Sequence, residues 1–394
     1  MTTGDEPAPT RRAVGPLYLA GFTTAFGAHG IAAALGAESE GIGLSILSFG
    51  VILALYDIAE VILKPVFGSL SDRIGVKPVI LGGLAVFALA SFCGIFAATP
   101  VWLAVARLGQ GAAASAFSPA SSAAVARFAG PNGAGRYFGR YGSWKSLGYA
   151  LGPLLGAALI SLDGFRGLFI ALTVLAAATA VLVAVAVPAL PVLPRPRYTL
   201  LDVAKQSIDP GFLIPTLVLA ASTAALGVAV GFLPLLGASL GLGVFGSMAA
   251  VTVLALTSTI SQPIVGRLRD AGSLHTRSGT TAGLLLTSVG IAVVALVPLP
   301  VTLYISAVLI GAGIGIATPL AFAHLATTTP PERMGRTMGN AELGREVGDA
   351  GGPLLVGAIA AGATLPAGLG ALAIVTVAVS GVSAATLRAP TPAR

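Results

Sequence analysis

The sequence has little charge and almost no cysteine. Only 9% of its 394 residues are Asp, Glu, Lys or Arg, whereas an ordinary soluble domain carries about 25%. So few charges cannot cover a water-exposed surface, which excludes a soluble globular protein. The one cysteine, Cys93, excludes an internal disulfide. No phosphate-binding loop, HExxH pattern or nucleophile arrangement occurs either, so the sequence supports no enzyme and predicts no metal or cofactor.

What the chain has in excess is apolar sequence, at 55% of its residues. A helix needs about 20 apolar residues to cross ~30 Å of hydrocarbon. Stretches of this kind lie at residues 14–36, 43–67, 78–98, 100–125, 140–161, 166–188, 211–235, 244–266, 279–299, 301–325, 340–361 and 366–387. The sequence therefore predicts an all-α integral membrane protein with twelve transmembrane helices.

The two halves of the chain repeat one pattern. The first half has Pro131, Gly135, Arg136, Gly139, Gly148, Gly152 and Pro153, and the second half has Pro331, Gly335, Arg336, Gly339, Gly348, Gly352 and Pro353, at identical spacing. A duplicated half in an apolar chain is typical of transporters whose halves rock around a site between them. We expect two pseudo-symmetric six-helix bundles, residues 1–190 and 211–394, joined by a cytoplasmic linker at residues 191–210.

The net charge of +7 indicates orientation rather than a nucleic-acid partner. Most of the 22 lysines and arginines lie at the termini or in alternate loops, whereas the opposite loops hold only Arg166. By the positive-inside rule, both termini and the linker are cytoplasmic. We therefore expect a multi-pass protein of the plasma (inner) membrane, a monomer whose partners are the lipid bilayer, a small-molecule substrate and protons.

Three motifs, in order along the chain, carry a family resemblance. The segment Gly68-Ser69-Leu70-Ser71-Asp72-Arg73-Ile74-Gly75-Val76-Lys77 is similar to a G-x-L-a-D-r-x-G-r-k signature, although Val76 stands where a basic residue is usual. Leu103, Arg107, Gln110 and Gly111 resemble an intramembrane arginine motif. Gly139, Gly148, Gly152, Pro153 and Gly156 have the spacing of an element associated with antiporters. Together they resemble the major facilitator superfamily over essentially the whole chain.

The resemblance implies that family's twelve-helix fold and its alternation of access between two bundles. It also implies gating or conformational roles for Gly68, Asp72, Arg73, Gly75, Gly148, Gly152, Pro153, Gly352 and Pro353. In physical terms, the glycines of residues 68–77 permit a tight turn, and Asp72 is placed either to cap a neighbouring helix N-terminus or to accept hydrogen bonds from basic groups. Either contact would latch the two halves. Gly148, Gly152 and Gly156 form a smooth helix face for close packing.

Nine charged residues fall inside the predicted spans, and an intramembrane charge is a functional-site hypothesis by default. The acidic ones are Asp57, Glu60, Glu342, Glu346 and Asp349, and the basic ones are Lys64, Arg107, Lys145 and Arg345. Glu342 and Lys64 are expected near cytoplasmic helix ends, solvated there. Asp57 and Asp349 fall near mid-span, where burial favours proton binding. Arg107 either belongs to a proton-linked cavity, as the resemblance implies, or only binds carbonyl oxygens of the first span.

We therefore predict a proton-coupling and substrate cavity formed by Asp57, Glu60, Arg107, Lys145, Arg345, Glu346, Asp349 and His29. The function this favours is a proton-coupled antiporter that exports small organic molecules, such as amphipathic or cationic drugs. An uptake symporter or facilitator for a sugar, amino acid or organic acid is the alternative. A membrane protein without transport activity is a third reading, which the buried charges disfavour.

Overall fold

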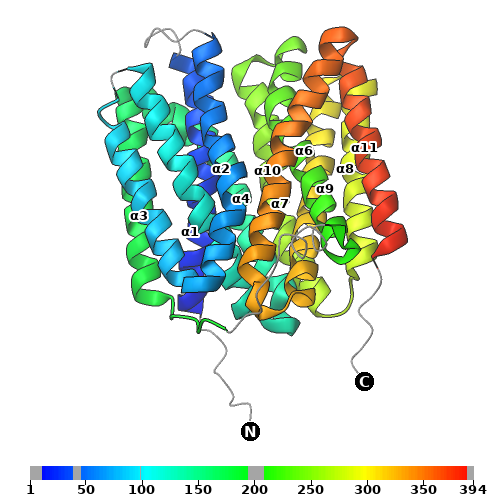
Figure 1. Ribbon diagram of the computed structural model, residues 1–394. Coiled ribbons are helices and arrows are strands. Elements are labelled where there is room, and N and C mark those ends of the chain that lie inside the picture. The colour runs from blue at the N-terminus through cyan, green and yellow to red at the C-terminus, as the bar shows by residue number, and fades with distance from the viewer. Residues whose placement is uncertain (1–10, 39–45, 98, 194–207, 388–394) are drawn as a thin grey trace.

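The computed structural model describes residues 11–38, 46–97, 99–193 and 208–387, so most of the predicted linker at 191–210 lies outside the described residues. The described part contains ten α-helices and one short 3-10 helix (Figure 1). They are α1 (Arg11–Glu38), α2 (Ile46–Ile74), α3 (Val76–Gly94), α4 (Pro100–Ala186), α6 (Pro210–Ser239), α7 (Gly243–Asp270), α8 (Thr276–Leu296), α9 (Pro300–Thr328), η1 (Pro331–Arg333), α10 (Met334–Gly362) and α11 (Leu365–Thr386).

The long element α4 is three helical segments joined end to end. Its backbone leaves helical geometry at Gly130, with φ of 59°, and again at Asp163 and Gly164, where φ of Gly164 is 58°. Glycine adopts this left-handed conformation at little cost, which explains why both breaks use it. With α4 counted as three, the described residues form twelve helical segments, six in each half of the chain.

Seven helices of the described part are long and apolar enough to cross a membrane. Helix α10 is not among them, because it carries Glu342, Arg345, Glu346 and Asp349 within two turns. Twelve crossings therefore remain a prediction, whereas the helical architecture is directly seen.

The helices form two bundles that stand side by side, α1–α4 and α6–α11 (Figure 1). Within the first bundle α4 packs on α1 and α3, and within the second α8 packs on α9 and α11. Between the bundles α2 faces α10, and α4 faces α7. Helix α1 begins and α11 ends at the same end of the molecule, the lower end in Figure 1.

Two predicted loop regions are instead helical. Helix α2 continues to Ile74, so Gly68, Asp72 and the exposed Arg73 lie in its last turns, and only Gly75, with φ of 97°, makes the turn into α3. Likewise α10 begins at Met334, not near residue 340. Hydropathy marks where a helix leaves the hydrocarbon, but backbone hydrogen bonding continues beyond that point, so the prediction stopped both helices too early.

The glycine faces pack within each bundle. A methyl group added at Gly156 would lie 2.5 Å from the carbonyl oxygen of Gly30 in α1, and one added at Gly352 would lie 2.5 Å from that of Ala224 in α6. Only glycine permits such backbone contact. The backbone departs from helical geometry at neither Pro153 in α4 nor Pro353 in α10, so these prolines do not end their helices.

Candidate functional site

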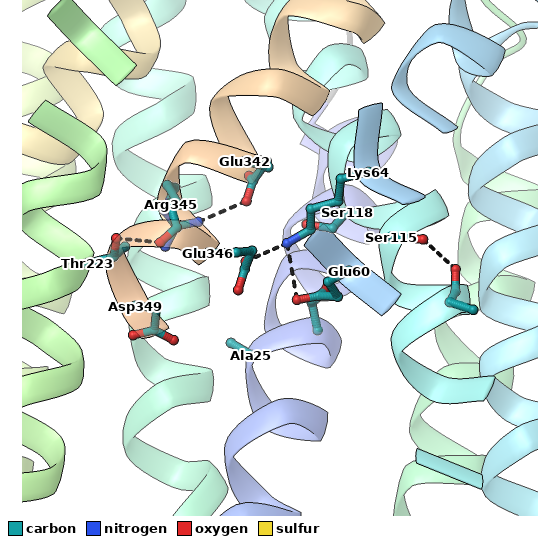
Figure 2. A network of polar contacts seen from close by, with 12 residues as sticks. Ala25, Glu60, Lys64, Ser115, Ser118, Thr223, Glu342, Arg345, Glu346 and Asp349 are labelled. Atoms are coloured by element: carbon teal, nitrogen blue, oxygen red, sulfur yellow. Dashed lines mark hydrogen bonds and ion pairs between the residues drawn. The ribbon is translucent and has the colours of Figure 1, made fainter. Parts of the chain in front are cut away.

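A buried lysine connects the two bundles. Lys64 of α2 forms an ion pair with Glu60 one turn earlier, at 3.2 Å, and a second with Glu346 of α10 (Figure 2). The Lys64 side chain has no exposed surface. One cation is thus shared by two carboxylates, one from each bundle, and we call Glu60, Lys64 and Glu346 the lysine triad.

A second triad inverts this charge pattern one turn away on α10. Glu342 accepts hydrogen bonds from Lys145 of α4, at 3.0 Å, and from Arg345 of its own helix, at 3.1 Å. Its other carboxylate oxygen accepts one from Ser122 at 2.9 Å. Here one buried carboxylate is shared by two cations, again one from each bundle, and we call Lys145, Glu342 and Arg345 the glutamate triad.

The expected solvation of Lys64 and Glu342 at helix ends is wrong. Both side chains are 0% exposed, because α2 and α10 extend several residues further toward the lower end than hydropathy indicated and place these groups inside the interface. A buried charge is tolerated only where partners surround it, and each of the two has two charged partners.

Asp349 is different, because no cation neutralises it closely. Its one possible ion-pair partner in the described part is His29 of α1, whose Nε2 lies 3.9 Å from Asp349 Oδ2 and which is charged only when protonated. The Oδ1 atom is buried and accepts no hydrogen bond there, while the side chain as a whole is 24% exposed. His29 also hydrogen-bonds through Nδ1 to the carbonyl of Ala25 and packs edge-on against Tyr149.

The two remaining predicted residues lie in the first bundle. Asp57 of α2 is exposed and makes no ion pair or hydrogen bond among the described residues. Arg107 of α4 is 1% exposed; it donates to the Gly27 carbonyl of α1 at 3.2 Å and to Gln110, and its guanidinium lies 4.3 Å above the Tyr56 ring. This geometry matches the carbonyl-binding alternative for Arg107.

Two carboxylates latch the bundles at their lower end. Asp72 at the end of α2 accepts hydrogen bonds from the backbone N–H groups of Gly335 (2.7 Å) and Arg336 (2.9 Å) at the start of α10. Asp270 at the end of α7 accepts the same pair from Gly135 (2.8 Å) and Arg136 (2.7 Å) in α4. The expected cap by Asp72 is present, and the repeat supplies its counterpart.

A neutral cluster joins α7 to α4. Gln262 of α7 donates from Nε2 to Ser258 one turn earlier, at 3.1 Å, and to Ser146 of α4 at 2.7 Å. These residues are not among the predicted site residues, since serine and glutamine in a span carry no strong sequence signal. Their positions one repeat length from the lysine triad were the one available clue.

The bundles are closed at the lower end. The described polar contacts between α2 and α10 involve residues 64–72 and 335–346, and those between α4 and α7 involve residues 135–146 and 258–270. The cavity that Lys145, Gln262 and Arg345 line has a volume of only about 20 Å³, room for about one water. The described residues therefore leave no space for a small organic molecule at this level of the interface.

Comparisons with known proteins agree with this architecture. The family model of the Major Facilitator Superfamily matches residues 17–271 and 216–394. The chain belongs to the Major Facilitator Superfamily. The predicted family is thereby confirmed, and with it a transporter fold of two helical bundles in a membrane rather than an enzyme.

Solved structures of this superfamily match nearly the whole chain. The crystal structure of the human organic anion transporter MFSD10 (TETRAN) superposes with a TM-score of 0.77 at 17% identity, covering 95% of this chain and 99% of that one. FucP in the outward conformation gives 0.78 at 14% identity, covering 95% and 98%. At such identities the likeness shows the fold alone.

Relatives with higher identity match only part of the chain. The multidrug resistance protein MdtG of Citrobacter koseri is 34% identical over 120 residues, 30% of each chain. MdtG of Enterobacter lignolyticus is 33% identical over 121 residues, 31% of this chain and 29% of the relative. The match thus spans less than a third of these relatives' length.

Proposed function

We propose that the protein is a proton-coupled antiporter that exports small amphipathic or cationic organic molecules across the inner membrane. The main support is the environment of Asp349, a carboxylate between the bundles. One of its oxygens is buried without a hydrogen-bond partner, and no lysine or arginine contacts it within the described residues. Such a group can hold either a proton or a substrate cation, and competition between the two is the simplest exchange mechanism.

The charge balance supports this assignment. In the two triads, three cations meet three carboxylates, so both triads together are neutral. Asp57 and Asp349 are left with Arg107, which binds a backbone carbonyl and an aromatic ring. One carboxylate is therefore in excess, and Asp349, at the bundle interface, is the one placed to exchange a proton for a cation.

The direction of transport rests on two further points. The MdtG relatives are named multidrug resistance proteins, and the glycine-proline element of residues 148–156 is associated with antiporters. On the predicted orientation, with both termini in the cytoplasm, the closed lower end would face the cytoplasm, and Asp349 would then exchange protons and substrate with the outside. An uptake symporter or facilitator is the alternative.

The test compares drug efflux in cells that carry wild-type protein, Asp349→Asn, Asp57→Asn or Glu346→Gln, with Asp163→Asn as control because that aspartate is exposed at the α4 break. Asp349→Asn mimics the protonated state, and we expect it to abolish proton-driven efflux, while Asp163→Asn stays at the wild-type level. Normal efflux in Asp349→Asn, with loss in another variant, would move the exchange site to that residue. Equilibrative flux that survives collapse of the proton gradient would support the facilitator.

A further inference from the structure

The two triads divide unequally between the bundles. Of the lysine triad, Glu60 and Lys64 belong to α2 and Glu346 to α10. Of the glutamate triad, Glu342 and Arg345 belong to α10 and Lys145 to α4. Each shared ion thus has one partner in its own helix and one across the interface. The partners in the same helix stay together whatever the bundles do.

Opening of the lower end must break the contacts across the interface. Lys64 then keeps Glu60, and Glu342 keeps Arg345, so each bundle retains an internal neutral pair. Glu346 and Lys145 each lose the partner they contact here. We propose that the access switch is a partial loss of charge partners, in which Lys64 and Glu342 each keep the partner in their own helix, while Glu346 and Lys145 are released into the cavity that opens at the lower end.

This arrangement lowers the free-energy cost of opening the lower end. A buried ion that lost every partner would resist separation strongly, and the bundles would stay locked. An ion that keeps a partner in its own helix loses only part of its stabilisation. The released Glu346 carboxylate lies three residues before Asp349, and residues at this spacing are neighbours on one helix face. Helix α10 thus has one carboxylate for each access state.

The proposal predicts opposite effects for two isosteric substitutions around the same lysine. In Glu346→Gln, Lys64 keeps only its partner within α2, so the closed state loses its ionic contact and the lower end opens more often. In Glu60→Gln, Lys64 has Glu346 as its one carboxylate partner. Separation of the bundles would leave Lys64 without any carboxylate partner, so the closed state is favoured. Removal of the same charge from the same cluster therefore shifts the equilibrium in opposite directions.

The measurement is the distance between spin labels at Ile74 and Ser273, both exposed, one at the lower end of each bundle, in the Cys93→Ser background and in liposomes. We expect the ratio of open to closed populations to rise at least about fivefold in Glu346→Gln and to fall by a similar factor in Glu60→Gln. Lys145→Gln, in the other triad, should open the end as Glu346→Gln does, and it replaces that variant if Glu346→Gln does not fold.

Shifts in the same direction for Glu60→Gln and Glu346→Gln, or no shift in either, would overturn the proposal, since a merely structural cluster has no reason to give opposite signs. The inference rests on the alternating-access part of the proposed function. Because the distances are measured without substrate or proton gradient, a failure here is distinguishable from a failure of drug export.

Discussion

The interface between α2 and α10 and the interface between α7 and α4 descend from the same repeat, and each has a carboxylate latch. Beyond the latch, however, the contacts are ionic in the first interface and neutral in the second. At the shift that relates Asp72 to Asp270, Glu60 corresponds to Ser258 and Lys64 to Gln262. At the shift that relates Gly335 to Gly135, Glu346 corresponds to Ser146. Gln262 contacts Ser258 and Ser146 as Lys64 contacts Glu60 and Glu346.

Both interfaces thus have one hydrogen-bond donor between two acceptors, and this arrangement does not depend on whether the groups are charged. The neutral version closes the interface with ordinary hydrogen bonds. The ionic version adds ion pairs, and the strength of these ion pairs depends on the protonation of their carboxylates and on bound ligands. Charge is therefore concentrated on one of two equivalent interfaces, where α10 also carries Asp349, and this localises the proposed exchange chemistry to the α2–α10 side.

The two interfaces should differ most in the stability that is lost when the central donor is removed. Lys64→Met leaves Glu60 and Glu346 buried without a cation, and we expect a loss of about 3–5 kcal/mol of stability. Gln262→Met removes two neutral hydrogen bonds and should cost about 1–3 kcal/mol. The fraction of monodisperse protein that survives a temperature ramp measures both. Equal losses would mean that the lysine triad is not a buried ionic cluster.

This comparison also shows what could be read from the sequence. The two-bundle helical fold was predictable because apolar length and the repeat determine it. The ion-pair partners were not, since contacts such as Lys64 with Glu346 join residues from different bundles, and their pairing depends on how the bundles meet. Hydropathy ends α2 too early and so predicts a solvated Lys64, whereas the additional helical residues place its side chain in the interface.

The role of Asp349 stayed a prediction for a related reason. Its mid-span position follows from counting residues, but its missing cation depends on which carboxylates the lysines and arginines reach in three dimensions. For Asp72 the sequence leaves two options, a helix N-terminus or a basic group, and the backbone N–H groups of Gly335 and Arg336 are among the partners that the structure shows. Its partner, the start of α10, follows from the repeat only after the fold is known.

Substitutions at the equivalent glycine contacts inside the bundles should differ less in the stability that they cost. A methyl group at Gly352 would meet the Ala224 carbonyl oxygen at 2.5 Å, whereas one at Gly152 would meet Gly30 N at 3.1 Å. Gly352→Ala must therefore move α10 away from α6, and we expect a loss of about 1–3 kcal/mol. Gly152→Ala needs a shift of only a few tenths of an ångström and should cost less. The same temperature ramp ranks the two; a larger loss in Gly152→Ala would contradict the packing described here.

Substitutions in the two latches should differ least in their effect on the open population, because the two latches have the same geometry. In Asp72→Asn and in Asp270→Asn the side chain keeps one acceptor oxygen, but an amide NH₂ replaces the other and faces a backbone N–H. Each variant also loses the favourable interaction of a negative charge with a helix N-terminus. Together these effects amount to about 1 kcal/mol, and each variant should raise the open population at the lower end about fivefold in the spin-label measurement between Ile74 and Ser273.

Because the two latches share no residue, the double variant should show the product of the two effects. A strong response to Asp72→Asn with none to Asp270→Asn would show that the α2–α10 interface controls opening alone, and that the asymmetry of charge extends to the latches despite their matching geometry.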